Sequence, residues 1–154
     1  MSPERFAKIK EVLNRRQPDL TVITDNVHKS RNLSAIVRTC DAVGIPQVHS
    51  ADPDDGFGTY HGTAKGSHRW VNVSIYEGVE KPISLLQKRG FRVYAATLSE
   101  RAVDYRTLDY TQPSAILLGA EKWGVSETAV DMADEHIIVP MMGMVESYNV
   151  SVAG

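Results

Sequence analysis

The sequence lacks a long hydrophobic segment and has very little cysteine. In 154 residues there is no uninterrupted apolar run of about 18, the length needed for a helix that crosses a bilayer. Met1 is followed by polar residues and a proline rather than by the apolar stretch of a signal peptide. Membrane and secreted classes are therefore disfavoured, and we expect a cytoplasmic protein. The single Cys40 cannot form a disulfide within the chain, and its place in an expected helix favours a small core residue over a nucleophile.

The sequence also lacks a strong excess of either charge. Its formal net charge is −2 at pH 7, so any binding of nucleic acid must come from local basic patches. The aspartates between residues 52 and 55 lack the glutamate and the spacing of a calcium loop, and a solvated turn is the simpler interpretation. The glycines between residues 56 and 62 have the wrong spacing for a dinucleotide-binding fingerprint, so we reject a Rossmann site here.

The sequence does contain an alternation of short apolar runs with segments of helical periodicity. Strands are predicted over residues 20–27, 47–51, 70–76, 91–98, 114–118 and 136–139. Helices are predicted over 33–43, with Gly44 as the stop, over 79–86 and over 126–134, with a further helix start near Ser147 and Asn149. Residues 104–113 are polar and irregular. The alternation predicts an α/β domain with a mainly parallel sheet flanked by helices.

A separate helix is predicted at the N-terminus, where Ser2 can cap and Pro3 can occupy the first turn. Its apolar residues recur at helical spacing and form one face. Beside that face, at about 100° per residue, a basic stripe is expected that consists of Arg5, Lys8, Arg15 and Arg16. A solvated surface is the default interpretation of such a stripe, and phosphate binding is favoured only if the rest of the chain indicates RNA.

Two short motifs lie where predicted strands meet helices. In the first, Asn32 is followed six residues later by Arg38, in a helix built for packing, where an arginine must reach solvent, a partner or a ligand. The second is the turn Gly119-x-Glu121-x-x-Gly124. Its glycines let backbone amides approach a ligand, and Glu121 places a carboxylate at the end of a strand.

A third motif follows the last predicted strand. Pro140 stops that strand, Gly143 permits a tight turn, and Ser147-x-Asn149 supplies small polar side chains. Thr97 lies at the end of another strand, at the edge where open parallel sheets hold their ligands.

In this order, the three motifs resemble the signature motifs of the SPOUT superfamily of RNA ribose methyltransferases, in its TrmH-like branch. The likeness runs along nearly the whole chain and looks closest to the bacterial enzymes that methylate the 2′-hydroxyl of guanosine 18 in the D-loop of tRNA. Residues 15–22 and 138–145 are similar to that subgroup in particular. The resemblance implies an α/β fold with a trefoil knot, a homodimer, a tRNA substrate, S-adenosylmethionine as cofactor and no metal.

The resemblance also implies roles for individual residues. Arg38 would face the ribose, while Asn32 and Glu121 would hold the reacting geometry. In the family this arginine is proposed to help deprotonate the 2′-hydroxyl, which attacks the sulfonium methyl in line, but its permanent charge suits positioning and charge stabilisation equally well. The cofactor pocket would be formed, largely through backbone groups, by Thr97, Leu98, Gly119, Ile138, Met141, Ser147 and Asn149. The basic stripe would contact tRNA, as would His28, Lys29 and Arg31.

The expected organisation is a basic helical extension over residues 1–18, for tRNA contact, and a SPOUT methyltransferase domain over 19–154. The helix that follows the third motif in the family would lie beyond Gly154, so we expect an incomplete knot. Tyr148 stands where the family usually has leucine, beside the expected adenine site. Two alternatives stay open: a noncatalytic RNA-binding fragment of such an enzyme, and a different small-molecule α/β enzyme that uses the same edge of the sheet and ignores tRNA.

Overall fold

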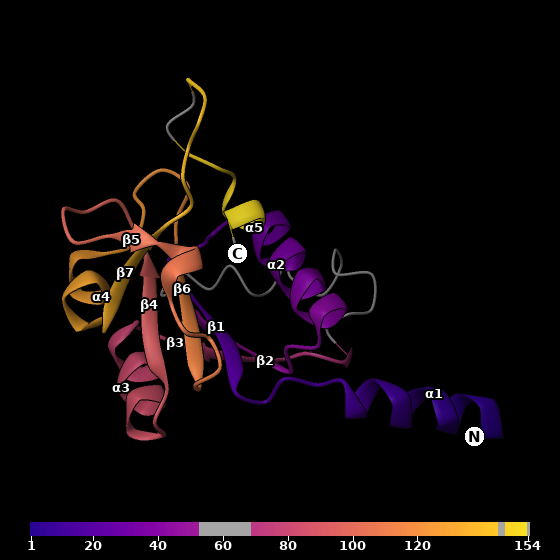
Figure 1. Ribbon diagram of the computed structural model, residues 1–154. Helices are drawn as coiled ribbons and strands as arrows, with labels where there is room; N and C mark the ends of the chain where they lie inside the picture. Colours follow the sequence, from indigo (N-terminus) through magenta and orange to yellow (C-terminus); the bar gives the residue numbers. More distant parts are fainter. Residues whose placement is uncertain (53–68, 145–146, 154) are drawn as a thin grey trace.

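The computed structural model describes residues 1–52, 69–144 and 147–153 (Figure 1). Within these ranges no helix has both the length and the apolar character needed to cross a membrane. Of the acidic and glycine-containing turn over residues 52–62, only Asp52 belongs to the described part of the chain.

Seven parallel strands form one sheet in the order β3-β2-β1-β6-β4-β7-β5 (Figure 1). They span Leu20–Asp25 (β1), Gln47–Ala51 (β2), Asn72–Tyr76 (β3), Arg92–Ala96 (β4), Val103–Asp104 (β5), Ser114–Gly119 (β6) and Glu135–Ile138 (β7). The predicted fold class is confirmed. The two-residue β5, which pairs with β7, was not predicted because a strand of that length shows no alternation.

Helices cover both faces of the sheet. The α-helices span Pro3–Asn14 (α1), Ser30–Val43 (α2), Glu80–Lys88 (α3), Glu127–Met132 (α4) and Val150–Ala153 (α5), and a 3₁₀ helix spans Tyr105–Thr107 (η3). In Figure 1, α2 and α5 lie on one side of the sheet and α3 and α4 on the other. Gly44 ends α2 as predicted: its φ is +86°, and a Cβ there would lie 2.7 Å from the carbonyl oxygen of Arg15.

Each face of the sheet has its own hydrophobic core, because neighbouring residues of a strand point to opposite faces. Val22 packs with α2 and α5 residues, while the adjacent Ile23 packs with residues of α3 and α4. Cys40 belongs to the first core, and burial raises the pKa of its thiol to about 12. The expectation of a small core residue is confirmed, and a thiolate nucleophile at neutral pH is excluded.

The N-terminal helix extends away from the sheet (Figure 1). Ser2 caps it as predicted, its hydroxyl accepting a hydrogen bond from the Arg5 amide at 3.3 Å. No residue of α1 is buried, so its apolar face is open. A groove of about 280 Å³ separates this face from the body, with Ile9 and Val12 on one wall and Trp70 on the other.

Arg16 connects the N-terminal segment to the sheet domain and does not belong to the exposed basic stripe predicted for the helix. Because α1 ends at Asn14, Arg16 lies beyond the helix, and its side chain is only 11% exposed. Its guanidinium donates hydrogen bonds to the carbonyl oxygens of Trp70 at 2.8 Å and Ile45 at 3.3 Å. These contacts assign Arg16 a structural part in the fold.

One buried histidine couples the fold to pH. His49, on β2, is 4% exposed, and its Nδ1 lies 2.9 Å from the hydroxyl oxygen of Tyr76. Burial, together with the positive charge of Arg89, lowers the pKa of His49 from 6.5 to about 4. Between these two pH values the unfolded chain binds a proton that the folded chain does not, so stability must fall as the solution is acidified.

We predict that the free energy of unfolding drops by about 2 kcal/mol more for the unmodified protein than for His49→Gln between pH 7 and pH 4.5. The glutamine keeps a polar side chain on β2 but does not titrate. Urea denaturation at both pH values measures the two changes. Equal losses in both proteins would contradict a depressed pKa at His49.

Candidate active site

The carboxyl ends of four neighbouring strands meet at one edge of the sheet. Gly119 of β6 pairs with Asp25 of β1, and β4 and β7 end beside them. A cavity of about 530 Å³ lies at this edge, within the usual size of a small-molecule site. Six of the seven residues expected to bind the cofactor line it: Thr97, Leu98, Gly119, Ile138, Met141 and Ser147.

The turn after β6 is folded tightly back on the end of its strand. Ala120 and Gly124 form an antiparallel bridge, with N–H···O distances of 3.0 and 2.7 Å. A Cβ on Gly119 would lie 2.1 Å from the carbonyl carbon of Gly124, which no side chain tolerates. Gly124 itself has a φ of +67°, in the left-handed region. The conformation of the turn therefore requires glycine at both positions, and it places Glu121 at the cavity rim.

Glu121 connects three segments that are distant in the sequence. Its carboxylate accepts hydrogen bonds from the Lys29 ammonium, before α2, and from Asn149 Nδ2, before α5, the latter at 2.6 Å. Asn149 Nδ2 also lies 3.5 Å from Oδ1 of the buried Asn32. The bond from Lys29, with further bonds from Asn32 and Asn149, holds the pKa of Glu121 below its usual value. The carboxylate is therefore ionised at neutral pH.

Asn149 is the expected cofactor residue outside the cavity lining. Its side-chain oxygen accepts hydrogen bonds from the Ser151 amide, at 2.9 Å, and from the Ser151 hydroxyl. Asn149 thus stabilises the first turn of α5, and the helix start predicted near this residue is confirmed. The next residue, Val150, is buried against α2 and lines the cavity.

Arg38 is not brought to the cavity. It lies on α2 six residues after Asn32, about 9 Å further along the helix axis at 1.5 Å per residue. Its side chain is exposed, and within the described residues it forms no hydrogen bond or ion pair. Of the three expected catalytic residues, the structure brings together Asn32 and Glu121 and leaves Arg38 apart.

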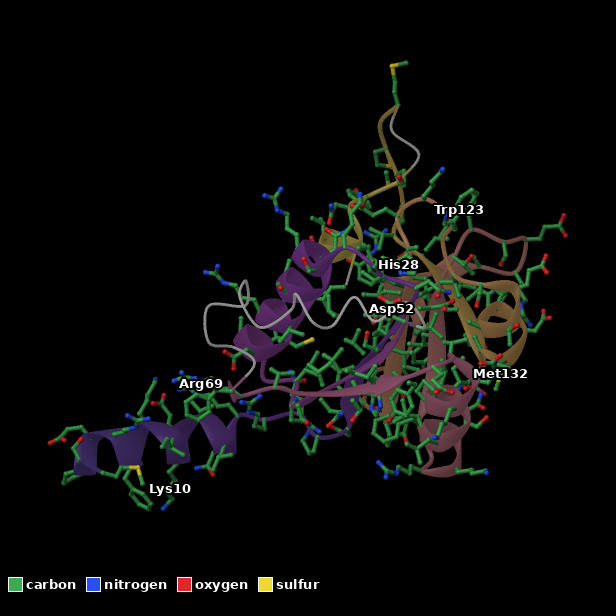
Figure 2. The ribbon with its side chains drawn as sticks, turned by 180° about the vertical axis from the view of Figure 1, so that it is seen from behind. Lys10, His28, Asp52, Arg69, Trp123 and Met132 are labelled. Atoms are coloured by element: carbon green, nitrogen blue, oxygen red, sulfur yellow. The ribbon has the colours of Figure 1, made fainter. Side chains whose placement is uncertain are left out.

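Two aromatic residues complete the cavity rim. Trp123, which sequence reasoning did not single out, lines the cavity yet is 76% exposed (Figure 2). The signal that could have indicated it is a tryptophan within a glycine-rich turn, where no strand or helix buries it. Tyr148, which stands where the family usually has leucine, also lines the cavity and is 43% exposed.

The residues expected to contact RNA fall into two groups. On α1, Arg5, Lys8 and Arg15 are exposed, and the last two pair with Glu11 at 3.1 and 2.8 Å. Near the cavity, His28 and Lys29 pair with carboxylates, His28 with Asp52 at 2.9 Å (Figure 2). Arg31 is exposed at the start of α2.

The chain is similar to known proteins along nearly its whole length. A model of the SpoU rRNA Methylase family matches residues 19–154. The tRNA (guanosine(18)-2′-O)-methyltransferase of Thermus thermophilus is 54% identical over 149 residues, which cover 97% of this chain and 77% of that protein. The structure of the A. aeolicus TrmH/SpoU tRNA modifying enzyme has a TM-score of 0.89 at 40% identity and covers 97% of this chain and 77% of that one. An AdoMet-bound rRNA methyltransferase from Sinorhizobium meliloti has a TM-score of 0.75 at 27% identity, over 90% of this chain and 57% of that one.

We predict that Gly119→Ala lowers the free energy of unfolding by more than about 2 kcal/mol, because the added Cβ overlaps the backbone of Gly124. Gly143→Ala is the matched control. A Cβ at Gly143 meets nothing within 4 Å, so its effect should stay within about 0.5 kcal/mol. Urea denaturation compares the two variants, and equal stabilities would disprove the required close approach.

Proposed function

The chain belongs to the SpoU rRNA Methylase family, and on this basis we propose that it transfers a methyl group from S-adenosylmethionine to the 2′-hydroxyl of a guanosine ribose in tRNA. The observation that carries the proposal is the cavity at the carboxyl edge, on whose rim Glu121 meets Asn32 and Asn149. The name of the Thermus thermophilus relative specifies guanosine 18, and this D-loop nucleotide is the proposed target.

The residues at this edge fit such a cofactor. The cavity has the volume of a small-molecule site, and Gly119 and Gly124 bring the backbone of the turn to its lining. Leu118, Ile138 and Val150 give it apolar walls. The cofactor supplies a methyl group on a sulfonium centre, which is already a reactive electrophile. The six lining residues given above would hold it, and Asn149 would support them through Glu121.

Glu121 acts as a fixed acceptor in this scheme. Its lowered pKa keeps it ionised, so it has no proton to donate at neutral pH. Its two oxygens instead hold Lys29 and Asn149 at the cavity rim. Side chains held in this way lose less freedom when substrate binds, and positioning of this kind contributes much of the rate of a transfer reaction.

Arg38 positions the ribose and stabilises negative charge on its 2′-oxygen. A guanidinium is always protonated in proteins, which suits it to electrostatic stabilisation better than to proton abstraction. Since Arg38 lies outside the cavity lining of its own chain, a homodimer would offer it a second cavity to approach. The homodimer is part of this proposal.

The tRNA would be held by two sets of cations, one on α1 within the proposed extension over residues 1–18 and one near the cavity, within the proposed catalytic domain over 19–154. The first consists of Arg5, Lys8 and Arg15, and the second of His28, Lys29 and Arg31. Arg16 is left out, because its guanidinium is committed to carbonyl oxygens of the body. Such contacts give affinity and register rather than base specificity.

A noncatalytic RNA-binding module is the second candidate, favoured by the separation of Arg38 from the cavity. It differs from the first in one measurable respect, since it predicts tRNA binding without methyl transfer.

We predict that the protein transfers label from radiolabelled S-adenosylmethionine to unmodified tRNA, as a 2′-O-methyl group on a D-loop guanosine. Arg38→Ala should lower kcat/KM by roughly 100-fold or more, because charge stabilisation at the reacting oxygen is lost. The Kd for S-adenosylmethionine should be unchanged. Lys88→Ala, which removes an exposed cation from α3, is the control and should retain full activity. Bound tRNA without label in the unmodified protein would select the noncatalytic alternative.

A second prediction concerns α1. Arg5→Ala combined with Arg15→Ala should weaken tRNA binding and make the plot of log K against log salt shallower by about 1.4 to 1.8, because two phosphate contacts are lost. Lys81→Ala combined with Lys88→Ala removes the same charge from α3 and should leave the slope unchanged. Filter binding between about 50 and 200 mM salt measures both. An unaltered slope in the α1 variant would exclude α1 from the RNA interface.

A further inference from the structure

A buried histidine outside the proposed catalytic residues holds the loop that follows β4. His136, on β7, is 2% exposed. Its Nδ1 lies 2.8 Å from the Ser99 hydroxyl oxygen and 3.2 Å from Arg101 Nε. Its Nε2 lies 2.9 Å from the Val130 carbonyl oxygen of α4. One imidazole ring therefore joins β7, α4 and the loop between β4 and β5.

The polar atoms of the ring all face partners on other segments. Nδ1 lies within hydrogen-bond distance of the Ser99 hydroxyl and of Arg101 Nε, and Nε2 faces the Val130 carbonyl oxygen. A guanidinium only donates, and Arg101 Nη2, which lies 2.7 Å from Nε2, also donates to the Val130 carbonyl oxygen at 3.2 Å. A hydroxyl can donate and accept, so Ser99 has a partner at Nδ1 in either tautomer of the ring.

The loop held by this ring forms a wall of the cavity. The Thr97 amide donates to the Ile137 carbonyl oxygen at 3.1 Å, which continues the pairing of β4 with β7. Ser99 is held by the His136 ring, and its own carbonyl oxygen accepts from the Ala102 amide at 3.1 Å. Between the two anchors lies Leu98, which lines the cavity although its side chain is 89% exposed. Such an exposed side chain gains little from packing, so the anchors on either side must fix its backbone.

We propose that His136 is a positioning residue for the cofactor pocket, because its ring, closed by Arg101, fixes Ser99 and through it the Thr97–Leu98 wall. The inference rests on the proposed function for the identity of the ligand, but the order of the loop can be measured without any ligand. Without His136, Ser99 and Arg101 lose their shared partner, and the loop keeps only the Thr97 bond to β7 and the bond from Arg101 to the Val130 carbonyl oxygen among the contacts described above.

The test compares four variants with the unmodified protein. His136→Leu keeps a side chain of similar size but removes both ring nitrogens. His136→Gln restores polar atoms that can pair with the Ser99 hydroxyl and the Val130 carbonyl oxygen. Ser99→Ala removes only the hydroxyl. His49→Leu is the control for general destabilisation, because His49 is also buried and hydrogen-bonded to a side-chain hydroxyl.

Two quantities are measured, amide hydrogen exchange over residues 98–102 without ligand and the Kd for S-adenosylmethionine by calorimetry. For His136→Leu we expect exchange and Kd each to rise roughly tenfold, as for a lost buried hydrogen bond, with kcat at saturating cofactor changed less than about threefold. His136→Gln should restore both to within about threefold, and His49→Leu should change neither. If His136→Leu does not fold, Ser99→Ala takes its place in the test. For Ser99→Ala, the exchange rate and the Kd should each rise about threefold.

Unchanged exchange in a folded His136→Leu variant would overturn the anchoring role whatever the ligand. Faster exchange with an unchanged Kd would overturn the link to the cofactor. Faster exchange, in a case where the unmodified protein binds no S-adenosylmethionine, would support the anchor and contradict the proposed function, so the two failures are distinguishable.

Discussion

Parallel pairing of β6 with β1 on one side and β4 on the other is the constraint on which the site depends. The register places Gly119 opposite Asp25, so these strands end together and the segments leaving them converge at one edge. Because Gly119 has no side chain, the following turn folds back on the end of β6. This close approach places Glu121 at the rim, within reach of residues that precede α2 and α5. The cavity edge is therefore shaped by the strand register and by the close approach of the turn to Gly119.

The Glu121 carboxylate pairs with polar side chains from two other segments at the cavity rim. Glu121 holds Lys29 and Asn149 in the free protein. A phosphate group offers the same kind of acceptor as a carboxylate, so bound tRNA would compete with Glu121 for Lys29. Under the proposed function, contact with RNA and order at the cavity rim would thus share one cation. The net charge of −2 leaves little attraction between this protein and RNA beyond such local groups.

Periodicity and turn chemistry were enough to predict the parallel α/β fold and most of its elements, since both depend on residues close together in the sequence. The Gly119 turn was also identified, because a glycine requirement is a local property.

Side chains whose partners are distant in the sequence could not be placed in this way. Arg16 was expected on a basic stripe, but its acceptors are carbonyl oxygens of other segments. His136 was counted only as part of a buried strand, although its ring joins three segments. Arg38 was grouped with Glu121 by resemblance, and only the path of α2 reveals their separation. The knot and the homodimer stay predictions.

Under the proposed function, S-adenosylmethionine occupies the carboxyl-edge cavity rather than the groove beside α1. Isotope-filtered NMR on protein with ¹³C-labelled isoleucine and valine methyl groups tests it directly, because both sites contain such residues. We predict nuclear Overhauser effects from cofactor protons to Ile138 and Val150, which line the cavity. Effects to Ile9 and Val12, which line the groove, without any to Ile138 or Val150, would contradict it.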